Sequence, residues 1–89
     1  TIDYPKFFTP NGDGYNDTWN ISTLGNQPNA KISIFDRYGK LIQQIRPSGA
    51  GWNGSYNGKN LPSTDYWFVV NYTESGEEKI FRAHITLKR

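Results

Sequence analysis

Oxygen-bearing side chains are concentrated near the start of the sequence, and their spacing suggests cation binding. Asn11, Asp13 and Asp17 are separated by two and four residues, and a backbone carbonyl near Tyr15 adds another oxygen. Calcium prefers carboxylate, amide and backbone carbonyl oxygens as ligands. The three side chains are therefore a candidate calcium site. We expect no cofactor to be required, and Ca²⁺ is the one candidate.

The same stretch is also consistent with a loop that binds nothing and stabilises its own fold. Residues 10–14 contain the turn signals Pro-Asn, Asn-Gly and Asp-Gly, in which glycine accepts positive φ angles and Asn and Asp hydrogen-bond nearby backbone. An EF-hand register that starts at Asn11 fails, because Asn16 stands where glycine is needed and Ser22 where a bidentate Glu is needed. Both interpretations of the loop remain open at this point.

Side chains suited to catalysis are scarce. His84 is the one histidine, and the pattern around it places it on the polar face of a strand. No G-x-S-x-G segment is present to hold a nucleophilic serine on a strained turn. The sequence therefore predicts a protein that is not an enzyme and that has no catalytic residues.

Short strands are the elements expected to position the loops. Nine Gly, five Pro and nine Asn interrupt the sequence too often for a helix. Strands are predicted at residues 5–8, 18–21, 30–35, 41–45, 66–72 and 79–88, with irregular connections at 23–29, 46–64 and 73–78. Pro5 favours an edge position for the first strand. The predicted fold class is all-β, an immunoglobulin-like antiparallel β-sandwich of about seven strands.

The expected core follows from the alternation of apolar and polar residues along these strands. Residues 30–45 predict a hairpin about a type I turn from Asp36 to Gly39. Trp52 and Tyr56 are expected to be buried and to keep the stretch 46–64 ordered. The side chains expected to share one face of their strand are Trp19 and Ile21; Ala30, Ile32 and Ile34; Tyr66, Phe68, Val70 and Tyr72; and Phe81, Ala83, Ile85 and Leu87.

Length, charge and cysteine content narrow the class of protein. The 89 residues are expected to form one domain, cut from a longer protein, and to be monomeric in isolation. The net charge of +2 is scattered, which argues against nucleic-acid binding. No apolar run approaches the roughly 18 residues that span a bilayer, so no membrane insertion is expected. The lack of cysteine excludes disulfides and thiolate metal sites.

Six stretches carry a resemblance to a known family. In order, they are FTPNGDGYNDTW (residues 8–19), IFDRYGKLI (34–42), WNGSYNGK (52–59), LP (61–62), DYWF (65–68) and FRAHITLKR (81–89). Together they resemble the gliding-motility-associated C-terminal domain, which is the type B sorting domain of Bacteroidetes type IX secretion. Two departures are small: Asp65 stands where the family often has Gly-Thr, and Ala83 where it often has Gly.

The resemblance implies a domain at the C-terminus of large exported proteins such as adhesins. Such a domain is read in the periplasm by the outer-membrane translocon, typically with a PorP/SprF-like outer-membrane protein, and ends at the cell surface or outside the cell. Because a sorting signal has only to fold and be recognised, the resemblance agrees with the lack of catalytic residues. Related sorting domains of the other type are removed by a sortase, but the resemblance does not imply that cleavage for this chain.

Two regions are alternative candidates for recognition by the partner, and the sequence does not choose between them. One is the polar loop, with Asn11, Gly12, Asp13, Gly14, Asn16 and Asp17, and the other is the chain end, with Lys88 and Arg89. A basic chain end after a core strand suits capture by a partner. It is also consistent with a charged strand end that discourages edge pairing, which is the more common role of such residues.

A rival function comes from the aromatic side chains. In a calcium-dependent carbohydrate-binding or adhesive module, Trp52, Tyr56 or Trp67 would form an exposed stacking platform, and Trp67 is the best placed of the three. A spacer domain in a repeat array is a third interpretation. A contiguous exposed aromatic patch would favour the binding module.

Overall fold

The computed structural model describes residues 2–10, 17–27 and 29–88. Its regular elements are seven strands and one turn of 3-10 helix: β1 (Phe7–Phe8), η1 (Ser22–Leu24), β2 (Lys31–Phe35), β3 (Leu41–Ile45), β4 (Ser55–Tyr56), β5 (Lys59–Asn60), β6 (Asp65–Glu74) and β7 (Glu77–Leu87). The predicted all-β class is confirmed. The 3-10 turn η1 begins at Ser22, one residue before the predicted loop 23–29, and the rest of it lies in that loop. Within the described ranges, no helix is long and apolar enough to cross a membrane.

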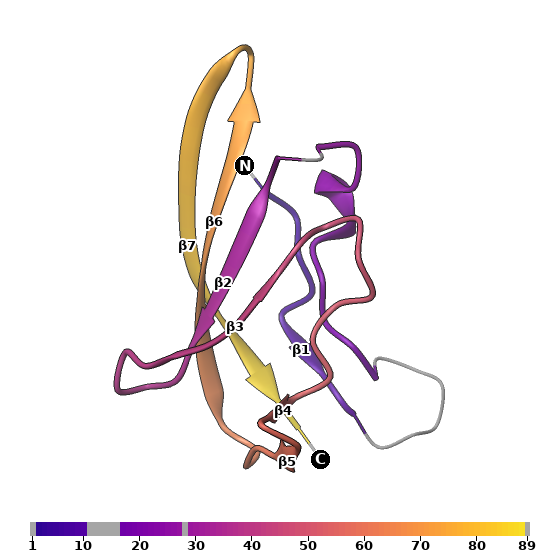
Figure 1. The fold of residues 1–89 in the computed structure, drawn as a ribbon, viewed down its shortest axis with the longest axis vertical. Coiled ribbons are helices and arrows are strands. Elements are labelled where there is room, and N and C mark those ends of the chain that lie inside the picture. Colours follow the sequence, from indigo (N-terminus) through magenta and orange to yellow (C-terminus); the bar gives the residue numbers. More distant parts are fainter. Residues whose placement is uncertain (1, 11–16, 28, 89) are drawn as a thin grey trace.

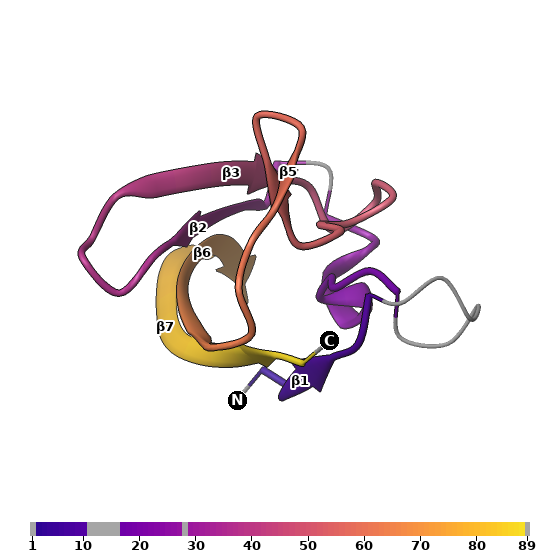
Figure 2. The same ribbon diagram turned by 90° about the horizontal axis from the view of Figure 1, so that it is seen from below.

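The strands form two sheets of unequal size (Figure 1). The larger has the order β1-β7-β6-β2-β3, and β4 and β5 form the smaller. Figure 2 shows the larger sheet curving, with the segments that carry η1 and the small hairpin across its open side. The arrangement is a β-sandwich, as predicted. The sheet is mixed rather than wholly antiparallel, however, because β1 pairs parallel with β7, Phe7 opposite Thr86 and Phe8 opposite Leu87.

The first strand lies at the edge of the sheet, as Pro5 predicted, although Pro5 itself precedes it. A proline lacks the N–H that a ladder requires, so pairing begins only after it. Phe8 is 1% exposed and packs its ring 5.4 Å from that of Trp52. This short edge strand therefore closes the core at the end where the chain leads into residues 9–10.

The predicted inward faces of the long strands are confirmed. Ile32 and Ile34 of β2 are fully buried, and Phe68 and Val70 of β6 lie opposite them in register. Tyr72, Phe81 and Ala83 are only partly buried, although they pack against the core. Figure 1 gives the reason: the β6–β7 hairpin extends beyond the segments that cover the rest of the sheet.

Two hairpin turns differ from the sequence prediction. The connection predicted at 73–78 is only two residues long, Ser75 and Gly76, with φ of 53° and 80°. It is shorter than predicted because β6 extends to Glu74 and β7 begins at Glu77. In the stretch predicted as irregular, β4 and β5 pair about Asn57 and Gly58, with φ of 52° and 79°. Two consecutive positive φ angles make a turn whose twist matches that of a hairpin, and Asn-Gly is its preferred sequence.

The strand predicted at 18–21 is reduced to a single bridge. Trp19 pairs with Trp52 through two backbone hydrogen bonds, Trp19 N to Trp52 O at 2.8 Å and Trp52 N to Trp19 O at 2.9 Å. Trp19 and Ile21 are fully buried, so their predicted common face is confirmed. Trp52, at 2% exposure, is buried as expected. The bridge ties the two segments that cover the sheet to each other.

Candidate functional site

Most of the predicted polar-loop residues fall outside the described residues. These are Asn11, Gly12, Asp13, Gly14 and Asn16, and Arg89 at the chain end is also outside. Asp17 is half-buried and lies with Pro10, Thr18 and Asn53 around a shallow depression. In the part of the chain that is described, no group of three or more His, Cys, Asp or Glu side chains gathers as a metal site. The calcium site therefore stays a prediction.

Lys88 connects the two predicted recognition regions. Its backbone N–H donates to the carbonyl of Phe8 at 3.0 Å, and its side-chain nitrogen lies 4.8 Å from the centre of the Phe7 ring. Two residues beyond Phe8 the chain reaches Pro10 and the polar loop. The parallel pairing of β1 with β7 therefore brings the end of the last strand and the start of the loop to the same end of the sandwich.

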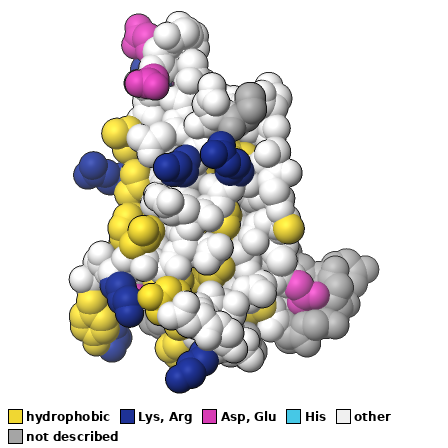
Figure 3. All heavy atoms as spheres, in the orientation of Figure 1, with side chains coloured by type: hydrophobic (Ala, Val, Ile, Leu, Met, Phe, Trp, Pro, Cys, Tyr) yellow, Lys and Arg dark blue, Asp and Glu magenta, His cyan; other side chains and the backbone are white. Residues whose placement is uncertain are grey.

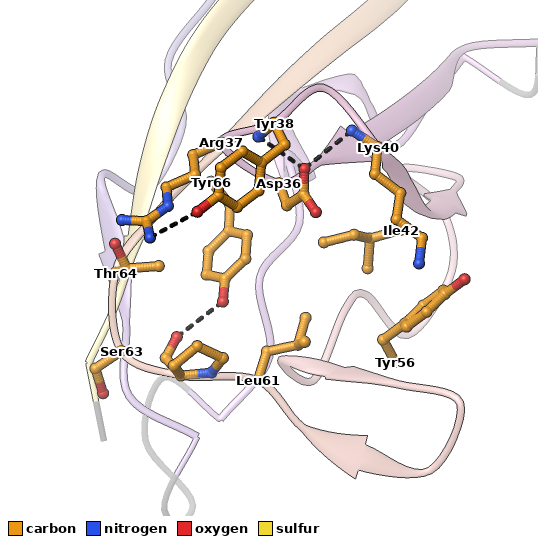
Figure 4. A pocket seen from close by; sticks show the side chains of 11 residues that line it. Asp36, Arg37, Tyr38, Lys40, Ile42, Tyr56, Leu61, Ser63, Thr64 and Tyr66 are labelled. Carbon is orange, nitrogen blue, oxygen red and sulfur yellow. Dashed lines mark hydrogen bonds between the residues drawn. The ribbon is translucent and has the colours of Figure 1, made fainter.

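A groove of about 470 Å³ opens between the β2–β3 turn and the segment from Tyr56 to Tyr66 (Figure 4). We call it the Tyr38 groove. Its floor is apolar: Ile42 is 7% exposed, Tyr66 is 2% exposed, and Leu61 packs against the core. Tyr38, at 80% exposure, stands at one wall and Tyr56 at the other. The groove is thus an apolar trough between two tyrosines.

The β2–β3 turn presents its side chains at the rim because its own polar groups bond internally. One carboxylate oxygen of Asp36 accepts the backbone N–H groups of Tyr38 and Lys40, each at 2.9 Å. Gly39 has φ of 84° and donates to the Asp36 carbonyl at 3.0 Å. The predicted turn is confirmed. From this turn Arg37, Tyr38 and Lys40 line the groove: Lys40 runs beside Ile42 toward Tyr56, and Arg37 lies along Tyr38 near Thr64 (Figure 4).

Two cations face the groove. Arg37 donates from Nη2 to the Tyr38 hydroxyl at 2.9 Å, and the Lys40 ammonium lies 4.9 Å from the centre of the Tyr56 ring. A cation near an aromatic ring is attracted to its π face but keeps its charge. The rim of the Tyr38 groove therefore has a net positive charge, because among its described residues Arg37 and Lys40 outnumber the one carboxylate, Asp36, whose Oδ1 accepts two backbone N–H groups.

A row of three apolar side chains and one histidine crosses the outer face of the large sheet. The register places His84 of β7 opposite Trp67 of β6, Trp67 opposite Phe35 of β2, and Phe35 opposite Leu41 of β3. Trp67 is 43% and Leu41 45% exposed. Figure 3 shows hydrophobic side chains along the left margin of the molecule, with Lys and Arg beside them. We call these four residues the outer-face row.

The three aromatic residues predicted as a stacking platform differ in their exposure to solvent. Trp52 is buried and donates its indole N–H to the Ser55 carbonyl at 3.0 Å, which excludes it from a surface platform. Tyr56 is half-buried in the wall of the Tyr38 groove. Trp67 is exposed and tilted against His84, with ring centres 6.2 Å apart. Only Trp67 of the three has the exposure that stacking requires.

Comparison with known families identifies the chain. A family model described as a type IX secretion signal domain matches residues 2–87. The chain belongs to this family. Its role is that of a sorting signal: it interacts with the type IX secretion machinery and is exported to the cell surface or extracellular space. A comparison with curated protein sequences finds no match.

For a secretion signal, the functional site is a surface that the machinery contacts. The type IX family match covers the residues of the Tyr38 groove and the outer-face row, and at the junction it covers Phe8 and ends at Leu87, one residue before Lys88. Sequence reasoning treated Asp36 to Gly39 as a turn only and missed the groove. The available signal was an aromatic residue, Tyr38, with Arg37 and Lys40 close to it in a predicted tight turn.

Proposed function

We propose that the chain is a non-catalytic C-terminal sorting domain of the type B, gliding-motility-associated class, and that residues 1–89 form one domain of a larger exported protein. It passes through the periplasm and is recognised as a folded unit by the outer-membrane translocon with a PorP/SprF-like protein. The observation that carries this proposal is the match of a type IX secretion signal model to residues 2–87. The six resembling stretches support the type B assignment.

The origin of the surfaces supports recognition of the folded unit. The Tyr38 groove combines residues 36–42 with residues 56–66, and the outer-face row draws on four strands. Neither surface exists in an unfolded chain.

A reporter assay tests this function. A periplasm-targeted fluorescent reporter is fused ahead of residues 1–89 in a type IX-competent bacterium, with and without the PorP/SprF-like protein. We expect the reporter outside the cell only when that protein is present. Phe68→Asp is the control for folding, because Phe68 is 1% exposed and a buried unpaired carboxylate unfolds the domain. A wild-type reporter that stays in the periplasm with the partner present would refute the proposal.

One observation favours a second function, a calcium-dependent carbohydrate-binding or adhesive module. Trp67 is 43% exposed beside Phe35 in the outer-face row, and an exposed aromatic ring on a sheet is a stacking surface. Binding to immobilised polysaccharides, with Ca²⁺ and with chelator, tests it. Calcium-dependent binding that Trp67→Ala abolishes would establish the second function, and no binding under either condition would reject it.

A further inference from the structure

We infer that the Tyr38 groove is the docking surface for an acidic segment of the type IX machinery, which lays an apolar side chain on the floor and sets carboxylates against Arg37 and Lys40. The inference rests on the proposed function and names the surface and the chemistry of its partner. It differs from the expectation that the polar loop or the chain end is read.

The size and lining of the groove suit a peptide segment. Its volume of about 470 Å³ lies within the range of roughly 300–1,000 Å³ that is usual for binding sites. The floor is made by Ile42, Leu61 and the ring of Tyr66. The Tyr66 hydroxyl donates to the Pro62 carbonyl at 2.8 Å, which fixes the floor against the segment beneath it. An apolar side chain placed there displaces water from apolar surface without losing a hydrogen bond.

The positive charge at the rim of the groove indicates an acidic partner. Arg37 uses one guanidinium nitrogen on Tyr38, and a guanidinium has five N–H donors in all. Lys40 contacts the face of Tyr56, which leaves its ammonium donors for an oxygen ligand. Among the described residues of the rim, these two cations outnumber the one carboxylate, Asp36, which accepts two backbone N–H groups at Oδ1. Carboxylates of a partner form the charge-assisted hydrogen bonds that this rim offers.

A second copy of the chain fits this surface poorly. In a two-fold dimer the same patch faces itself, so the Arg37 and Lys40 side chains of the two copies would meet. Like charges placed together across an interface disfavour association. The positive rim therefore favours an acidic segment of another protein.

Charge reversal in the export assay is the first test. The double variant Arg37→Glu/Lys40→Glu is compared with Lys79→Glu/Arg82→Glu, which makes the same change of charge at two exposed positions on β7, outside the groove. We expect the groove variant to lose export tenfold or more and the β7 variant to stay within twofold of wild type. Equal melting temperatures for the three proteins establish that the fold is intact.

Zero-length cross-linking is the second test, because it reports the contact itself. A water-soluble carbodiimide joins the Lys40 amine to a carboxylate within contact distance, forming an amide while the reagent takes up the water. During export we expect a product in which Lys40 is joined to Asp or Glu of a translocon component. Lys40→Arg, which keeps the charge but has no primary amine, must lose that product.

The outcomes distinguish this inference from the function on which it rests. A wild-type reporter that is not exported overturns both. If the wild-type reporter and the groove variant are exported equally well, only the docking surface is overturned. The docking surface is also overturned if the groove variant and the β7 variant lose export equally, because that result would show an effect of net charge. A cross-linked product that joins Lys40 to another copy of this chain overturns the acidic-segment assignment. A neutral polysaccharide that protects Lys40 from cross-linking overturns it as well.

Discussion

Replacing Gly51 with Ala tests whether the backbone bridge between Trp19 and Trp52 holds the two covering segments together. Gly51 has φ of 93°, and a Cβ at this position would lie 2.7 Å from the carbonyl oxygen of Trp19. That oxygen belongs to the backbone, so it cannot move aside as a flexible side chain would. Gly76 is the matched control, because its φ is 80° and nothing lies within 4 Å of the added Cβ.

The two substitutions share one cost and differ in the other. A left-handed conformation destabilises the folded state by about 1–2 kcal/mol for an L-residue. Alanine also makes the unfolded chain less flexible than glycine does, which stabilises the folded state by about 0.4–1 kcal/mol. Gly76→Ala should therefore lose about 1 kcal/mol. Gly51→Ala must also displace the Trp19 carbonyl, which accepts one of the two bridge hydrogen bonds. Displacing this carbonyl breaks the bridge, whose two hydrogen bonds contribute about 1 kcal/mol each, so the total loss is about 3 kcal/mol.

Thermal unfolding followed by circular dichroism measures the difference. At about 4–8 °C per kcal/mol for a domain of this size, Gly76→Ala should lower the melting temperature by about 4–8 °C and Gly51→Ala by about 12–24 °C. Native stability for a chain of this length is roughly 4–13 kcal/mol, so Gly51→Ala removes a large share of it. Equal losses for the two variants would show that only backbone strain matters and that the bridge contributes nothing.

Two further predictions concern the tryptophans and the metal. Trp52→Ala should cost about 3–5 kcal/mol because Trp52 is 2% exposed, whereas Trp67→Ala should cost about 1 kcal/mol because Trp67 is 43% exposed; urea unfolding measures both, and similar midpoints would contradict this burial argument. If Asn11, Asp13 and Asp17 hold Ca²⁺, an excess of about 100 times the dissociation constant raises stability by about 2.7 kcal/mol, and Asp17→Asn weakens the effect. A melting temperature unchanged by Ca²⁺ and by chelator would reject the site.

The long strands could be predicted because their signal is local. Ile32 and Ile34 alternate with polar residues in β2, as Ile85 and Leu87 do in β7, and all four are fully buried. Successive side chains of a strand point to opposite faces, so the period of two identifies the buried side without knowledge of the partner strand.

The short elements were harder to predict because their partners are not local. Among the described residues, Trp19 belongs to no strand and pairs with Trp52, which follows Gly51 with its positive φ. The hairpin at Asn57 and Gly58 did have a local signal, the Asn-Gly pair, and the frequency of glycine in residues 46–64 obscured it. Elements of two residues carry too little alternation to be recognised.

By itself, the sequence determined the all-β class, the core-facing side chains and, through ordered motifs, the type IX family, because each of these is written in neighbouring residues. Only the tertiary structure decided the parallel pairing of β1 with β7 and the assembly of the Tyr38 groove from Asp36 to Ile42 and Tyr56 to Tyr66. These depend on contacts between distant segments, whose free energy comes from burying a shared core. Alternation within a strand contains no information about which strand it will meet.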